Sequence, residues 1–179
     1  PFAVGAAGTV LVRRDGTWLF AIQFGPATRK NTLTCVDVTD DGGRIWFAGL
    51  AGALGCYDVS SGKKYDYSNP RGKPSTWEAI AVTGERGNET LRVANGAGEV
   101  FSATMDGSSC PQWDEVVTPG RGSSITALDF GDRHAYAVDE SGVVFEERSN
   151  DWAEIGVENA QVDFFDVNAQ DGTVHVAGD

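Results

Sequence analysis

The chain repeats one short glycine-centred pattern along its whole length. Each copy joins two strand-like runs through a turn, and the anchoring residues are Gly8, Gly52, Gly98 and Gly142. The steps between these glycines are 44, 46 and 44 residues. A strand-rich repeat of this length is typical of β-propellers, in which each repeat forms one blade. The pattern predicts an all-β array of blades, with the four glycines in equivalent turns between second and third strands.

The unit between residues 124 and 156 shows the pattern most clearly. Its runs 124–130, 134–138, 143–148 and 152–155 are rich in strand formers, and turns of Gly, Asp, Asn and Ser separate them. Such runs predict a four-stranded antiparallel blade. No segment carries the spacing of a capped amphipathic helix. We therefore expect a single β-propeller domain over 1–179, with repeats at approximately 1–32, 33–75, 76–122 and 123–159 and a partial repeat at 160–179.

The order of the strands predicts an incomplete ring. The chain opens with runs that match second, third and fourth strands, and it ends with runs 161–167 and 173–177 that match a first and a second strand. Second strands therefore outnumber the others, which favours a segment of a larger propeller. Such a segment exposes a sheet edge and invites self-association. A closed four-bladed ring is the alternative.

The composition is strongly acidic and poor in lysine. The net charge is −12, with 26 acidic residues and four lysines. This argues against nucleic-acid binding, which needs clustered basic residues. Acidic, lysine-poor surfaces resemble those of halophiles, where salt screens the self-repulsion. Two locations are therefore compatible with the composition, the cytoplasm of a halophile and the surface of a cell. No apolar run is long enough to predict a membrane span.

A second pattern follows the anchoring glycines. Asp15-Gly16 with Trp18, Asp106-Gly107 with Trp113, and Asn150-Asp151 with Trp152 each come after one of them. The pattern resembles the bacterial-neuraminidase-repeat (BNR) propellers, and within them the photosystem II assembly and stability factor group. The resemblance covers the whole chain and implies a propeller that binds a protein or a glycan. The family's Asp-box is contracted here to residues 14–18, and Tyr65 replaces the Trp of the second repeat. These departures speak most against the sialidase branch.

Three aspartates, Asp37, Asp129 and Asp166, occupy matching places near the ends of three expected first strands. First strands line the central channel of a propeller, so these carboxylates predict an acidic ring that could hold a cation or a basic side chain. The alternative is that each aspartate caps the turn after its strand, because strand-end Asp usually bonds local backbone.

Large side chains recur six residues before the anchoring glycines. Phe2, Trp46 and Tyr136 occupy this position, and Arg92 occupies it in the third repeat. Equal positions on equivalent strands share one face. We interpret the aromatic residues as packing between blades, with binding at Trp46, Arg92 and Tyr136 as the alternative. Arg92 breaks the aromatic series and is expected to stack on a neighbouring ring.

Catalytic chemistry lacks a signature in this sequence. A sialidase-like site needs several arginines for the substrate carboxylate, a Tyr–Glu pair and an acid, yet no spacing singles out Arg44, Arg92, Arg133 or Tyr136. Asp-rich turns such as Asp40-Asp41-Gly42 lack the ligand alternation of a calcium loop. We therefore expect no catalytic, cofactor or metal site. The sequence predicts a non-catalytic module that binds a protein partner, with an assembly or scaffold role. A glycan-binding propeller and a structural part of a larger assembly are the alternatives.

Overall fold

The computed structural model describes residues 1–179 except 26–30, 71–74, 108–109, 150 and 157–161. The described strands form five antiparallel sheets, which we number along the chain. The first contains β1 (Phe2–Gly5), β2 (Thr9–Arg14) and β3 (Thr17–Gln23), and the second contains β4 (Leu33–Val38), β5 (Arg44–Gly49), β6 (Leu54–Asp58) and β7 (Lys64–Asp66). The third contains β8 (Trp77–Thr83), β9 (Thr90–Asn95), β10 (Val100–Thr104) and β11 (Gln112–Trp113). The fourth contains β12 (Ile125–Phe130), β13 (Ala135–Asp139), β14 (Val144–Arg148) and β15 (Asp151–Ile155), and the fifth contains β16 (Phe164–Gln170) and β17 (Thr173–Gly178).

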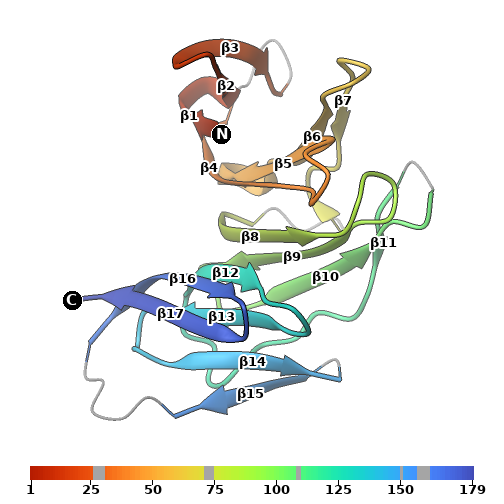
Figure 1. Ribbon diagram of the computed structural model, residues 1–179. Coiled ribbons are helices and arrows are strands. Elements are labelled where there is room, and N and C mark those ends of the chain that lie inside the picture. Colours follow the sequence, from red (N-terminus) through yellow and green to blue (C-terminus); the bar gives the residue numbers. More distant parts are fainter. Residues whose placement is uncertain (26–30, 71–74, 108–109, 150, 157–161) are drawn as a thin grey trace.

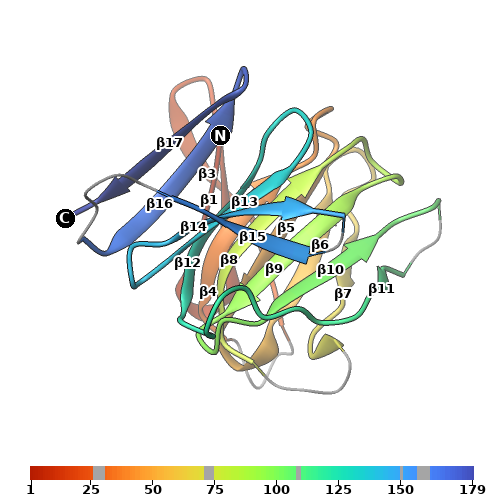
Figure 2. The same cartoon turned by 90° about the horizontal axis from the view of Figure 1, so that it is seen from below.

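The sheets follow one another as the blades of a propeller (Figure 1). Strands β4, β8, β12 and β16, the first strands of their sheets, lie side by side in chain order, and Figure 2 shows the sheets fanning out from them. The helical segments that lie wholly within the described residues are short 3₁₀ turns, η1 (Ala6–Gly8) and η2 (Leu50–Gly52). The predicted all-β blade array is therefore confirmed. Neither segment approaches the length or apolar character that a membrane-spanning helix requires.

A β-bulge near the start of each first strand aligns the blades residue by residue. The register shifts between Leu33 and Cys35, and at the same place in the other three first strands. After the shift, Cys35 pairs with Ala48 and Ala127 pairs with Val138. Because a bulge inserts one residue into the pleat, the bulged residue of each blade leaves the regular alternation.

The anchoring glycines lie in the turns between second and third strands. Gly8, Gly52, Gly98 and Gly142 all have positive φ, between 68° and 78°. Space is restricted there as well, because the chain entering the next sheet crosses each turn: a Cβ added to Gly98 would lie 2.5 Å from the carbonyl oxygen of Ser123. Glycine meets both conditions, since it adopts positive φ without a Cβ clash. The repeat in the sequence thus marks the contact between each blade and the next.

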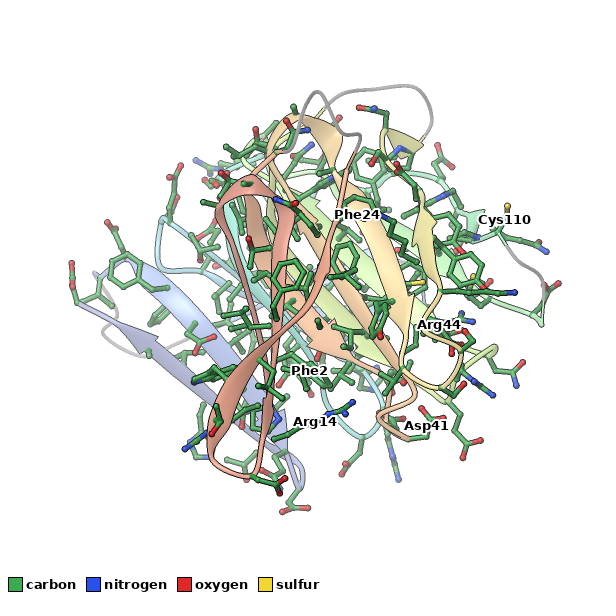
Figure 3. All side chains as sticks on the ribbon, turned by 90° about the horizontal axis from the view of Figure 1, so that it is seen from above. Phe2, Arg14, Phe24, Asp41, Arg44 and Cys110 are labelled. Carbon is green, nitrogen blue, oxygen red and sulfur yellow. The ribbon has the colours of Figure 1, made fainter. Side chains whose placement is uncertain are left out.

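The apolar core is divided among the gaps between neighbouring sheets. Trp46 of the second sheet packs with Trp77 and Phe101 of the third, and all three are buried. Phe24 follows the first sheet and packs edge-on against Phe47 of the second at 4.7 Å (Figure 3). Burial in each gap therefore depends on a neighbouring blade, as in other repeat architectures.

The described residues form an open arc. Strand β16 pairs with β17, β1 pairs with β2, and the first and fifth sheets share no strand pairing among the residues described. Figure 1 shows these two sheets at separate places along the arc. A four-bladed ring closed by strand pairing, the alternative that the sequence left open, is not formed here.

Candidate functional site

A groove of about 460 Å³ runs along the first strands, where a propeller has its central channel. Its carboxylates come from four sheets, and the described lining includes no lysine or arginine. They are Asp37, Glu78, Asp129 and Asp166. We call this feature the channel groove. Its charge is one-signed, so the groove attracts cations and repels anions.

Two of these aspartates join neighbouring blades. Asp37 accepts a hydrogen bond from the amide of Val38 at 2.8 Å and another from the amide of Val82, in the next first strand, at 2.7 Å. Asp129 does the same with Phe130 at 2.9 Å and Ala169 at 2.7 Å. Hydrogen bonds to an ionised acceptor are the stronger ones. These side chains therefore fix the spacing of the first strands and the shape of the groove.

The strand register corrects the predicted position of Asp166. Asp37 pairs across its sheet with Trp46, and Asp129 pairs with Tyr136, whereas the residue at the same place in the fifth sheet is Asn168, opposite His175. Asp166 lies two residues earlier, because a shorter hairpin joins β16 and β17 than joins β4 and β5. The three aspartates are therefore not equivalent. Asp166 still lines the channel groove, where it is exposed and accepts a bond from the Val167 amide at 3.0 Å.

The sequence missed Glu78, although a signal for it exists. Glu78 is the bulged residue of β8, and the bulged residues of β4 and β12 are Thr34 and Thr126. Both threonine hydroxyls donate to a carbonyl at the start of the next first strand, at 2.6 and 2.7 Å. Glu78 stands in the same row and is exposed to the groove. Thr34 and Thr126 mark the bulge position in the sequence of two repeats. Glu78 could have been recognised as the residue at the same position of the repeat between them.

Burial raises the pKa of the Asp37 carboxyl to about 6. The amides of Val38 and Val82 oppose this effect, while Asp129 and Asp40 add to it by like-charge repulsion. The ionised form of Asp37 is therefore held at a cost that a bound cation would reduce. Among the described residues, no group of three or more His, Cys, Asp and Glu side chains is placed to hold a metal ion.

The position that carries Phe2, Trp46, Arg92 and Tyr136 faces the next blade along the chain. Trp46 is fully buried and stacks on Tyr67 at 5.4 Å. Tyr136 is half-buried beside β17. Trp46 therefore packs between blades and offers no binding surface, whereas Tyr136 stays partly accessible.

Arg92 finds its partner in the next blade. Its guanidinium makes an ion pair with Glu147 of β14 at 2.8 Å and lies over the Phe130 ring at 5.6 Å. The expected stacking on a neighbouring ring is therefore present. Glu147 lies five residues after its anchoring glycine, and Ala103, which shares a buried cluster with Trp46, holds the same place one blade earlier. Sequence reasoning missed Glu147, and comparing these two positions along the repeats would have found it.

A second charge cluster joins the second and third sheets. Arg44 makes an ion pair at 2.7 Å with Glu89, whose side chain is fully buried, and lies 3.9 Å from Asp58. Arg86 reaches Asp58 from the next sheet at 3.3 Å. Burial raises the pKa of the Asp58 carboxyl. Hydrogen bonds from Ser61 and Ser60 and the positive charge of Arg86 outweigh this effect, so the pKa stays well below its usual range. Arg44, labelled in Figure 3, therefore has a structural role, because both of its ion pairs lie between the second and third sheets or within them.

The groups of a sialidase-like site converge only in part. Tyr136 donates to Glu146 at 3.3 Å, and Arg148 pairs with Glu146 at 2.5 Å. Arg44 and Arg92 are held in ion pairs between other blades. Burial and the neighbouring Glu146 raise the pKa of Tyr136, which makes its hydroxyl a poorer nucleophile. Arg133 lines a pocket together with Tyr136, so of the arginines considered for such a site this one alone is placed beside the Tyr–Glu pair in the described part of the chain.

Comparison with known proteins places the fold among β-propellers. No family model matches the chain, and no curated protein matches it in sequence. Among solved structures it is similar to a chain of the mitotic checkpoint complex, with a TM-score of 0.69 and 14% identity over 92% of this chain and 50% of that one. The RRP9 WD40 repeats match with a TM-score of 0.65 and 16% identity over 95% and 48% of the two chains. U3-55K matches with a TM-score of 0.65 and 19% identity over 97% and 53%.

These matches establish the class of fold. The blade-repeat β-propeller is shared, and this chain spans about half the length of each of the three structures. Identities this low carry the fold alone, since one fold hosts many functions.

Proposed function

We propose that this chain is a non-catalytic interaction module and that its channel groove binds a basic segment of a protein partner. The observation that carries the proposal is the one-signed groove, with carboxylates from four sheets and no described cation among its lining residues. A basic segment lowers the repulsion among these carboxylates. Complementary charge of this kind speeds association and makes binding specific for basic partners. The net charge of −12 favours the same class of partner.

The groove is suited to binding because its walls are already in place. The hydrogen bonds from Asp37 and Asp129 hold adjacent first strands at a fixed spacing. A partner therefore does not have to order the site, which keeps the entropic cost of binding low. One similar structure is a chain of a multiprotein complex, in keeping with an assembly or scaffold role.

The test is the binding of a lysine- and arginine-rich peptide, measured by calorimetry at 0.15 M salt. Glu78→Gln with Asp166→Asn removes two groove charges that bridge no neighbouring blades. Exposed charges contribute about 0.2–1 kcal/mol each, so we expect affinity to fall by about fivefold. Glu140→Gln with Glu154→Gln is the charge-matched control, because neither residue lines the groove. Equal weakening by both double variants would reject the groove as the site.

We further propose that the chain has no glycosidase activity. The support is the engagement of Arg44 and Arg92 between blades and the raised pKa of Tyr136. An activated sialoside and a panel of aryl glycosides provide the assay. Turnover that disappears in Tyr136→Phe contradicts the proposal.

We also propose that the chain is related to the BNR propellers, and the support is the glycine and tryptophan pattern of its repeats.

We propose in addition that the chain associates with itself. The first sheet exposes Trp18 at 47% and Phe20 at 63%, and its strand β1 has one unpaired edge among the described strands. Apolar flanks and free edges favour association with another chain.

A further inference from the structure

A second pocket, of about 480 Å³, lies between the third and fourth sheets, away from the channel groove. We call it the interblade pocket. Arg92 and Ser102 line it from the third sheet, Glu147 and Trp152 line it from the fourth, and residues 114–118 close its outer side. None of these residues lines the channel groove.

A bulge in the outer strand opens this pocket. The amide of Asp114 donates to the carbonyl of Ser102 at 3.0 Å, and Val117 exchanges hydrogen bonds with Val100 at 2.8 and 3.1 Å. Two residues, Glu115 and Val116, therefore stand opposite the single residue Phe101. Such a bulge bends the strand and redirects its side chains, and bulges are over-represented next to functional sites.

Two polar groups that line the pocket have unused bonding capacity. The Glu147 carboxylate accepts three hydrogen bonds from Arg92. Nε donates to both carboxylate oxygens at 3.1 Å, and Nη2 donates to Oε1 at 2.8 Å. The Oε2 atom of Glu147 thus accepts one bond from the described residues, although a carboxylate oxygen can accept two. Ser102 is 9% exposed, and its hydroxyl has no hydrogen-bond partner within the described part of the chain. The buried polar atoms without a partner in the described residues belong to Arg44, Trp46 and Trp77. The Ser102 hydroxyl is instead accessible from the pocket that it lines, where it can bond a ligand.

The charge of the lining selects the sign of the ligand. Asp114, Glu115 and Glu147 oppose the single cation Arg92, which its ion pair already neutralises. Val116 and Val117 give the pocket apolar walls. Trp152 is only 8% exposed, so it offers an edge and no open face on which a sugar ring could stack. The lining therefore fits an elongated ligand with an aliphatic stem and a positive end.

We propose that the interblade pocket binds a lysine side chain of a protein partner. The ammonium group has three donors, and Ser102 Oγ, Glu147 Oε2 and the Glu115 carboxylate are three available acceptors. The four-carbon stem lies along Val116, Val117 and the edge of Trp152, as long charged side chains commonly cover apolar surface. The inference rests on the proposed binding of a basic protein, and it assigns a separate site to one residue of that partner.

The experiment uses small probes, so that it tests the pocket apart from the channel groove. n-Butylammonium is titrated into the full chain while the indole N–H resonance of Trp152 is followed by NMR at 0.15 M salt. We expect a saturable shift with n-butylammonium and none with n-butanol or butyrate. The absence of a saturable shift, or an equal shift with n-butanol, overturns the proposal.

Variants separate the pocket from general attraction to an acidic protein. Glu115→Gln is expected to weaken n-butylammonium binding about two- to fivefold, the range for one exposed charge, while Glu154→Gln on the fourth blade, outside the pocket lining, leaves binding unchanged. Equal effects of the two variants overturn the assignment. The groove variant with Glu78→Gln and Asp166→Asn should leave this titration unchanged, so failure of one site is distinguishable from failure of the other.

Discussion

The side chains between blades vary in chemistry while their positions stay the same. Trp46 and Ala103 belong to one buried cluster between two blades, and Arg92 pairs with Glu147 at the equivalent positions in the next gap. A large apolar residue opposite a small one fills space by packing. An ion pair of similar size fills the same space but must also offset the desolvation of two charges. The repeat therefore conserves a geometry that different residue pairs can satisfy.

The Arg92–Glu147 pair gives a direct test of this view. Glu147→Gln leaves a guanidinium that is only 11% exposed without its counter-charge, and we expect a loss of about 3 kcal/mol in the free energy of unfolding. Chemical denaturation measures it. Glu146→Gln, which breaks the exposed pair with Arg148 on the neighbouring residue, is the control and should cost less than about 1 kcal/mol. A similar loss in both variants contradicts a structural role for the buried pair.

Asp37 predicts a pH dependence of stability. Its native pKa of about 6 exceeds the ordinary value of 3.8, so the native state keeps this proton to higher pH than the unfolded state does. The stability that this bound proton contributes is present below about pH 4 and is lost as the pH rises to about 6. The loss in the free energy of unfolding is no more than about 3 kcal/mol. Asp37→Asn removes this titration. Its stability relative to the parent chain should rise between pH 4 and 6.5, measured by denaturation at each pH. A constant difference rejects the assignment.

At the level of the residue, sequence reasoning located strand faces better than partners. The six-residue offset from the glycines predicted the position that faces the next blade, because a strand alternates with a fixed period. Arg92 was recognised as the exception, yet its partner Glu147 lies 55 positions away and follows from the arrangement of blades. Asp166 was misplaced by two residues because a hairpin length is a local choice that the repeat does not determine.

The elements of each blade depend on the glycine turns. Gly98 combines a φ of +75° with contact against the chain that enters the next sheet. Gly107 has a φ of +80° but open space around it. The two residues therefore separate the cost of the backbone conformation from the cost of the contact, which the sequence alone cannot do because both are simply glycines in turns.

Alanine at these two positions should destabilise the chain unequally. Gly107→Ala meets only the unfavourable φ, which costs about 1 kcal/mol. Gly98→Ala also forces Ser123 and Gly122 to move, so we expect a loss of about 3 kcal/mol or more in the free energy of unfolding, within the range for strained substitutions. Thermal and chemical denaturation provide the comparison. Equal losses would show that the crossing chain adapts freely, against the tight contact described here.

The strands themselves were predictable because short alternating runs between Gly- and Asp-rich turns are a strong signal. The bulges were not, although they determine which residues reach the channel. Thr34 and Thr126 occupy the bulge position of the first strand in two blades. Glu78 and Phe165 occupy it in the other two, so no single residue type marks it. The outer-strand bulge at Glu115 and Val116 was missed for the same reason. Both candidate sites lie at such irregularities, where local rules give way to the packing of whole blades.

The whole molecule carries a large negative charge on an arc-shaped body. At a net charge of −12, mutual repulsion among carboxylates opposes the compact state, and salt screens that repulsion. We expect the melting temperature to rise with potassium chloride between 0.05 and about 2 M. Chloride is preferred over sulfate because sulfate stabilises most proteins by exclusion from the surface. A melting temperature that stays flat or falls contradicts the halophilic interpretation of the composition.

Association of the chain is the last consequence of the open arc. Trp113 and Trp152 each pack against the preceding blade, and their equivalent in the first sheet, Trp18, has no preceding blade among the described residues and is 47% exposed. With Phe20 it forms an apolar flank beside the unpaired edge of β1, so we expect the 179-residue chain to associate as its concentration rises.

Light scattering tests this association. Trp18→Ser with Phe20→Ser should shift the chain toward the monomer. Phe165→Ser, at an aromatic residue exposed by 53% in the channel groove, is the control and should leave association unchanged. A monodisperse particle of about 19 kDa at every concentration, with the parent chain stable, contradicts association through the flank. It would show instead that burying this face is unnecessary for the arc, because the cores between the other sheets suffice to hold it.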